Sequence, residues 1–280
     1  MRRRALLGLP GLGVLGAALA ACGEEPPVTP DSRTIRYGDD PSQFAELRLP
    51  SGTPRGVVVV LHGGFWKAEY DLSLGRPLAA DLVTRGWATL NVEYRRVGPP
   101  GAAGAAGGGG GAPATLDDVA AAIDALADVD GLDLSTVVTL GHSAGGHLAA
   151  WAASRGRFER WAGGVDVTAV VSQAGVLDLR AAHRDGLGGG AVAAFLGHPP
   201  GPEDDAVDPR RQLPLDVPLW CVHGRHDDIV PLAQSEEYVA AATDAGARAE
   251  LVAVDGDHFV VLDLAGAAWA RTLAILDTLG

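Results

Sequence analysis

Two hydrophobic patterns alternate along the chain from residue 34 to its end. Short apolar runs predict strands within residues 56–64, 87–95, 135–143, 167–175, 216–224 and 247–258, and residues 34–38 and 44–50 predict a short antiparallel start. Longer segments with helical spacing of apolar residues lie between them, at 72–86, 115–128, 144–154, 231–246 and 265–280. Strands separated by helices of this length form a mostly parallel sheet covered on both faces, so the pattern predicts an α/β fold.

Residue types that can take part in catalysis follow four of the predicted strands. They are "HGG" at 62–64, "GHS" at 141–143, "HGRHD" at 223–227 and "DGDH" at 255–258. Ligands of open parallel sheets bind beyond the carboxyl ends of the strands. The sequence therefore predicts one functional site at this edge of the sheet.

Two segments interrupt the alternation. Residues 98–113, "GPPGAAGAAGGGGGAP", are of low complexity and predict a mobile surface loop. Residues 178–216 are irregular, with a single helix-like piece at 190–197, and predict a small cap over the strand ends. The remaining chain, residues 34–280, is predicted to be one catalytic domain.

The stretch "TLGHSAGGH" at 139–147 places Ser143 where a strand turns into a helix. Flanking glycines allow a sharp turn, and a serine at such a turn projects its hydroxyl outward. A serine hydroxyl is a weak nucleophile, so it needs a base and a group that orients the base. Ser143 is thus a candidate nucleophile.

His258 is the best candidate for the base because it follows the last predicted strand and precedes the last helix. Asp227 is the favoured orienting acid, and Asp228 is the alternative. Four other histidines are weaker candidates for the base, since two lie in the cap and two at the preceding strand end, where a strand-terminal or solvent role is simpler. They are His183, His198, His223 and His226.

An oxyanion site is expected after the apolar strand in "VVVVLHGGFW", because glycines there let backbone N–H groups approach a ligand. The amide of Ala144, which follows the nucleophile, can complete it. His62 is expected to brace this loop by hydrogen bonding, without proton transfer. Phe65 and Trp66 are expected near the site or in the core, and Glu93 is expected to have a structural ion-pairing role.

With these residues assembled, the chain resembles the α/β-hydrolase superfamily, in the order nucleophile, acid, base. "HGGFW", "GHSAGGHLA", "YGDDPSQ" and "NVEYRR" resemble its branch of small carboxylesterases and arylformamidases (kynurenine formamidases). The resemblance implies an α/β-hydrolase fold and a triad of Ser143, Asp227 and His258. It also implies oxyanion donors at Gly64, Phe65 and Ala144, and a close turn at Gly63.

Residues 1–21 have the form of an export signal, with three arginines, an apolar stretch and small residues. "LAAC" resembles the lipobox of bacterial lipoproteins, with Cys22 as the lipid attachment point, and "RRRALL" resembles a twin-arginine signal. An ordinary cleaved signal with an incidental cysteine is the alternative. Residues 22–33 predict a lipid-anchor cysteine and a proline-rich tether, so an exported protein anchored outside the cytoplasmic membrane is expected.

The net charge and the cysteine content limit which classes of partner and cofactor are expected. The formal net charge of −13 disfavours nucleic acid and anionic membrane surfaces, so membrane contact is expected only through Cys22. Of the two cysteines, Cys221 lies in an apolar run and predicts a buried small hydrophobe, and no cysteine–histidine spacing resembles a zinc site. Neither a metal nor an organic cofactor is expected.

The residues together predict a serine hydrolase that cleaves small carboxylic esters through an acyl-enzyme. An amide hydrolase of the arylformamidase type is the nearest alternative. A peptidase related to prolyl oligopeptidases fits less well, because the chain has no room for a propeller-sized domain before this one. A catalytically silent, surface-anchored binding protein on the same fold is the alternative from another class.

Overall fold

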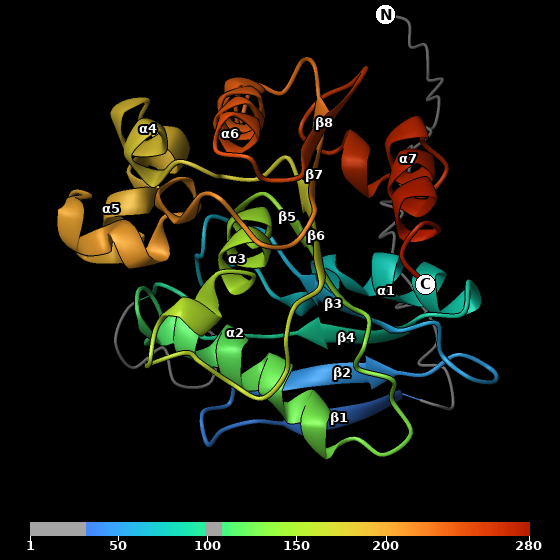
Figure 1. Cartoon of the computed structure of the whole chain (residues 1–280). Helices are drawn as coiled ribbons and strands as arrows, with labels where there is room; N and C mark the ends of the chain where they lie inside the picture. The colour runs from blue at the N-terminus through green and yellow to red at the C-terminus, as the bar shows by residue number, and fades with distance from the viewer. Residues whose placement is uncertain (1–31, 99–107) are drawn as a thin grey trace, which may run out of the picture.

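The computed structural model describes residues 32–98 and 108–280, and it contains one eight-stranded sheet (Figure 1). The strand order is β1-β2-β4-β3-β5-β6-β7-β8. Strands β3 to β8 pair in parallel, whereas β2 pairs antiparallel with β1 and β4. The strands are β1 (Ser32–Arg36), β2 (Phe44–Arg48), β3 (Val57–Leu61), β4 (Ala88–Val92), β5 (Val137–His142), β6 (Ala169–Gln173), β7 (Leu219–Gly224) and β8 (Ala249–Val254). The predicted mostly parallel sheet is confirmed.

Helices cover both faces of the sheet (Figure 1). The α-helices are α1 (Arg76–Thr84), α2 (Ala114–Asp124), α3 (Ala144–Ala152), α4 (Leu179–Arg184), α5 (Ala191–Leu196), α6 (Ala233–Asp244) and α7 (Ala267–Leu276). One core packs α1 and α7 against the sheet, and the other packs α2, α3 and α6 against its opposite face. Burial of these apolar faces is the main stabilising contribution to the fold.

The central strands bring the predicted site together. Leu61 of β3 pairs with Gly141 of β5. His142 of β5 pairs with Gln173 of β6. All residues of β3 and β5 are buried, as expected for apolar strands in the middle of a parallel sheet. This register places the carboxyl ends of β3 and β5 next to each other, so the loop after Leu61 meets the turn at Ser143.

The cap at 178–216 contains two α-helices, where the sequence predicted one helical piece. Helix α5 corresponds to that piece, and α4 was missed. Asp178 begins α4 as its N-cap, with its carboxylate accepting a hydrogen bond from the Ala181 amide at 2.7 Å. The remaining cap segments are 3₁₀ turns at Leu187–Gly189, Pro202–Val207 and Pro209–Gln212.

An aromatic cluster fixes the cap to the domain. Phe195 of α5 stacks on Trp66 with ring centroids 4.6 Å apart, and its edge meets His147 of α3 at 5.5 Å. Burial lowers the pKa of His147 to about 4, so this histidine is neutral and packs as a core residue. The cap is therefore anchored on the helix that follows Ser143.

Several predicted features lie outside the described residues. They are the export signal at 1–21, Cys22 and the tether up to residue 31, and residues 99–107 of the glycine-rich loop. Ser32 already belongs to β1, so the folded domain begins two residues earlier than predicted. No described helix, in either resolved stretch of the chain, is long and apolar enough to span a bilayer.

The end of the glycine-rich segment, residues 110–113, is packed against the domain. The Gly111 amide donates to Thr115 Oγ1 at 2.9 Å, and the Ala112 amide donates to the Phe195 carbonyl at 2.7 Å. A Cβ at Gly110 would lie 2.2 Å from the Arg95 carbonyl oxygen, so the close packing requires glycine there. The expectation of a mobile loop is therefore wrong for these residues.

Candidate active site

Ser143 occupies the turn between β5 and α3 in a strained conformation, with φ 56° and ψ −119°. Few non-glycine residues adopt a positive φ, and such strain is characteristic of functional turns. The Ser143 amide donates to the Gln173 carbonyl at 2.8 Å, which ties the turn to β6. The residue is 3% exposed, so its surroundings hold it in place while leaving little contact with water.

Two glycines allow the oxyanion loop to approach this turn. A Cβ at Gly145 would lie 2.0 Å from the Leu61 carbonyl oxygen, and a Cβ at Gly63 would lie 3.2 Å from Cβ of Ser143. Real Cβ atoms do not reach the first of these distances, so α3 packs against the end of β3 only because residue 145 has no side chain. The loop after β3 is thereby held in contact with Ser143.

We expect Gly145→Ala to lower the free energy of unfolding by about 3 kcal/mol or more, since backbone must move to admit the methyl group. Gly156→Ala is the matched control, because nothing lies within 4 Å of a Cβ at that position. Urea unfolding followed by circular dichroism measures both variants. Equal midpoints for the two variants would contradict the close approach at Gly145.

The predicted oxyanion residues lie in a tight, strained turn. Gly64, Phe65 and Trp66 have positive φ values of 107°, 54° and 56°, and the Lys67 amide donates to the Gly64 carbonyl at 2.9 Å. The first amides of a helix have no acceptor within the helix, and Ala144 is the first residue of α3. Its N–H and those of the turn are thus suited to meet an anion beside Ser143.

His62 and Glu93 form a buried support beneath this turn. His62 Nδ1 lies 2.8 Å from the Gly63 carbonyl oxygen, and its Nε2 lies 3.3 Å from Glu93 Oε1. The Glu93 carboxylate also accepts a hydrogen bond from the Leu72 amide at 3.0 Å. Burial alone would raise the pKa of Glu93, but the hydrogen bond with His62 and the charge of Arg96 hold it below its usual range.

Asp227 and His258 form the predicted acid–base pair, with His258 Nδ1 donating to Asp227 Oδ2 at 2.6 Å. The other carboxylate oxygen accepts the amides of Ile229 and Val230 at 2.9 and 2.8 Å. Burial opposes ionisation of Asp227, but these donors and a second histidine outweigh it, so its pKa lies well below its usual range. Asp228, the alternative acid, is exposed, and no hydrogen bond of its side chain to His258 is found in the described structure.

His142 connects the base to the nucleophile turn, and the sequence analysis did not assign it a role. Its Nε2 donates to the His258 carbonyl at 3.0 Å, and the two ring centroids are 4.5 Å apart. Burial and the neighbouring His258 lower the pKa of His142 to about 3, so its ring is neutral. Since His142 precedes Ser143 in the chain, this contact ties the segment that carries His258 to the turn that carries Ser143.

The remaining histidines occupy different environments. His226 is exposed and pairs with Asp255 at 3.0 Å, in agreement with a solvent role. His183 lies in α4, and exposed His198 lies near Glu203 and Asp204, a group whose ligand atoms fall within 4.8 Å of one another. That group has the composition of ordinary surface ion pairs, and Oδ2 of its buried member, Asp204, already accepts the Gly201 amide at 2.7 Å. His223 is fully buried and contacts Asp227, which the sequence analysis did not foresee.

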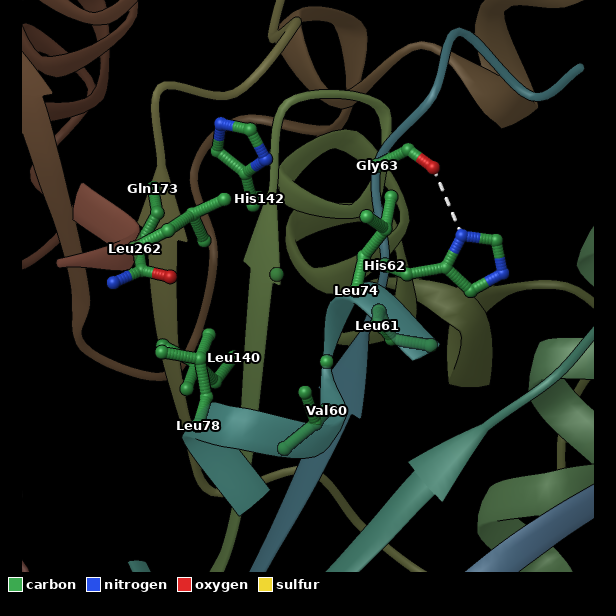
Figure 2. A pocket seen from close by; sticks show the side chains of 12 residues that line it. Val60, Leu61, His62, Gly63, Leu74, Leu78, Leu140, His142, Gln173 and Leu262 are labelled. Atoms are coloured by element: carbon green, nitrogen blue, oxygen red, sulfur yellow. Dashed lines mark hydrogen bonds between the residues drawn. The ribbon is translucent and has the colours of Figure 1, made fainter. Parts of the chain in front are cut away.

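A narrow apolar crevice borders the site on the α1 and α7 side of the sheet. Figure 2 shows its lining, with His142 and Gly63 at one end, while the His62 ring points away from the other residues. The apolar walls come from β3, β5, α1 and the 3₁₀ turns Leu72–Leu74 and Val260–Leu262. They are Val60, Leu61, Leu74, Leu78, Leu140 and Leu262.

Some large hydrophobic side chains are exposed beside residues of the site. We call Tyr70, Leu74 and Phe259 the apolar rim; all three are exposed, and Leu74 also lines the crevice. Phe259 is 55% exposed, and its ring meets His258 at 5.2 Å and His142 at 6.1 Å. Tyr70 lies against Gly64, where a Cβ would come within 2.4 Å of it. Clustered exposed apolar side chains commonly mark binding surfaces.

Solved structures that superpose on this chain have the α/β-hydrolase fold. An esterase from Thermogutta terrifontis, Est2, superposes with a TM-score of 0.69 at 23% identity, covering 91% of this chain and 93% of that one. The predicted fold class is thereby confirmed. The chain belongs to the BD-FAE family, whose model matches residues 47–241.

Two curated relatives are esterases of Mycobacterium tuberculosis. Esterase LipC is 28% identical over 227 residues, which is 74% of this chain and 54% of LipC. Esterase LipQ is 28% identical over 253 residues, which is 83% of this chain and 56% of LipQ. The chain thus spans about half the length of the curated relatives that it matches.

Proposed function

We propose that this protein hydrolyses carboxylic esters with Ser143 as the nucleophile, His258 as the general base and acid, and Asp227 as the group that orients His258. The observation that carries the proposal is the strained turn at Ser143 beside a buried Asp227–His258 pair with a 2.6 Å hydrogen bond. The His142 contact, which joins the two parts, adds support. The names of the curated relatives, both esterases, agree with it.

The proposed mechanism follows from the chemistry of these residues. His258 takes the proton of the Ser143 hydroxyl as the oxygen attacks the ester carbonyl, and the oxyanion is met by the amides of Gly64, Phe65 and Ala144. The alcohol leaves with the proton from His258, and an acyl-enzyme remains. Water then attacks the acyl group with His258 again as base, which restores Ser143. The cycle requires no metal or organic cofactor.

The apolar rim favours esters with an apolar acyl group. We expect kcat/KM for p-nitrophenyl butyrate to exceed that for the acetate by about 10-fold, because each buried CH₂ contributes about 0.8 kcal/mol. Phe259→Ser should reduce this ratio toward one while acetate turnover stays within about 3-fold of wild type. Initial rates of the acetate, butyrate and octanoate esters measure both effects.

N-formyl-kynurenine belongs in the same assay, since the arylformamidase branch uses comparable machinery. Turnover of esters with little cleavage of the formamide supports the proposal. Cleavage of the formamide alone would replace it by an amide hydrolase. A folded protein that turns over none of these compounds would favour a binding role on the same fold.

A further inference from the structure

A second histidine holds the carboxylate that orients His258. His223 Nε2 lies 3.1 Å from Asp227 Oδ2, the same oxygen that accepts from His258 Nδ1. The His223 side chain and that of Asp227 are both inaccessible to solvent. The proposed triad does not use His223, yet a buried polar ring requires partners and an explanation.

The contacts of His223 place a proton on its Nε2. Its Nε2 faces two acceptors, Asp227 Oδ2 and the Val230 carbonyl oxygen at 2.9 Å, so this nitrogen carries a proton. Its Nδ1 lies 2.8 Å from Ser235 Oγ. The Ser235 hydroxyl can donate to a lone pair on Nδ1, which satisfies the ring as the neutral Nε2–H tautomer.

These contacts link three elements around the acid. His223 lies in β7, Asp227 and Val230 lie in the turn that follows, and Ser235 lies in the first turn of α6. The ring therefore fixes the turn relative to both the strand and the helix. The amides of Ile229 and Val230 hold Oδ1, whereas His223 contacts Oδ2 together with His258.

We propose that His223 is a positioning residue, which aims Asp227 Oδ2 at His258 and shares the negative charge of the carboxylate, with Ser235 selecting the required tautomer. This inference rests on the proposed function for its rate measurements and not for its spectroscopic one. One lone pair of Asp227 Oδ2 then accepts a hydrogen bond from His223, and the other accepts one from His258. Ligand-orienting contacts of this kind affect activity by about 10- to 100-fold in comparable sites of metalloenzymes.

Other titratable groups near His223 do not complicate a test. Burial and His258 lower the pKa of His142 to about 3, and burial raises the pKa of the Cys221 thiol to about 12. Neither group titrates between about pH 5 and pH 9. Changes in that range upon substitution at His223 therefore do not come from His142 or Cys221.

The test compares His223→Leu, His223→Gln and Ser235→Ala, with His226→Gln as a matched control on the exposed part of the same turn. Three quantities are measured. They are kcat and KM for p-nitrophenyl butyrate, the pH profile of kcat/KM, and the low-field proton resonance of the His258–Asp227 hydrogen bond in ¹⁵N-histidine-labelled protein.

We expect His223→Leu to lower kcat by about 10- to 100-fold with KM within about 2-fold. The carboxylate then concentrates its charge on His258, so the acidic limb of the profile moves up by about half a pH unit and the low-field resonance shifts. The amide of His223→Gln can donate to Oδ2 and should restore kcat to within about 3-fold of wild type. Ser235→Ala should shift the acidic limb of the pH profile and the low-field proton resonance in the same direction as His223→Leu does, but by a smaller amount.

A folded His223→Leu variant with the wild-type limb and resonance would overturn the proposal. Where that variant fails to fold, a wild-type profile and resonance in Ser235→Ala would overturn it equally. A shift in His226→Gln as large as that in His223→Leu would also contradict a specific role. Absence of ester turnover in the wild type would count against the proposed function, whereas the proton resonance would still decide the role of His223.

Discussion

Ser143→Ala should lower kcat for p-nitrophenyl butyrate by about 10⁴- to 10⁶-fold, the largest effect expected for any single substitution in this chain. The substitution removes one oxygen atom from a turn that the Gln173 carbonyl and the neighbouring glycines hold in place. Residual hydrolysis would come from His258 acting on water and from the oxyanion donors. KM should stay within about 3-fold, because the apolar rim is unchanged.

The same variant separates chemistry from folding. Circular dichroism and the urea midpoint should change little, since alanine fills the position with one atom fewer and without a new contact. A fluorophosphonate probe should label the wild-type protein at Ser143 and leave the variant unlabelled. Retained turnover in a pure, folded variant would refute Ser143 as the nucleophile and with it the proposed mechanism.

The sheet and the location of the site follow from the sequence because they depend on local patterns. Apolar runs separated by helices of ten or more residues leave few topologies, and parallel strands direct the segments 62–64 and 141–143 to one edge. The same logic brought Asp227 and His258 to that edge, where the structure joins them directly. Periodicity and chain order were sufficient for these residues.

His142 and His223 were not predicted because their roles depend on contacts across the sheet edge. Nothing near His142 in sequence reveals that its ring meets the His258 carbonyl, 116 positions later. His223 ends an apolar strand, and its burial depends on Ser235, which lies beyond the turn. One usable signal existed in retrospect: a histidine four residues before the acid, at the carboxyl end of a buried strand, lies where a carboxylate partner is close.

The helix α4 and the ordered residues 110–113 were missed for different reasons. Helix α4, LRAAHR, is as short as α5, but three of its six residues are polar, so it shows no apolar run; it begins through the capping contact of Asp178. Residues 110–113 are rich in glycine, which by composition predicts a mobile loop. Their order comes from hydrogen bonds to Phe195 and Thr115, so it is a tertiary effect that no local composition encodes.

Asp227→Asn should lower kcat by about 10³- to 10⁴-fold through a change of tautomer in His258. The Ile229 and Val230 amides require an acceptor at Oδ1, so the asparagine oxygen occupies that position. Its NH₂ group then replaces Oδ2 and faces Nδ1 of His258. To avoid two opposed donors, His258 transfers its proton to Nε2, and the nitrogen that should take the serine proton no longer can.

Asp228→Asn provides the matched control, because it makes the same chemical change in the next residue, which is exposed. Its kcat should stay within about 2-fold of wild type. The low-field proton resonance should disappear in Asp227→Asn and persist in Asp228→Asn, which ties the loss of rate to one hydrogen bond.

If both variants lost activity equally, the turn as a whole would matter, and Asp227 would have no special role as the partner of His258. Retained activity in Asp227→Asn with an intact resonance would mean that another group orients the base. His223 cannot be that group, since its Nε2 still donates to the Val230 carbonyl at 2.9 Å and so has no lone pair for His258.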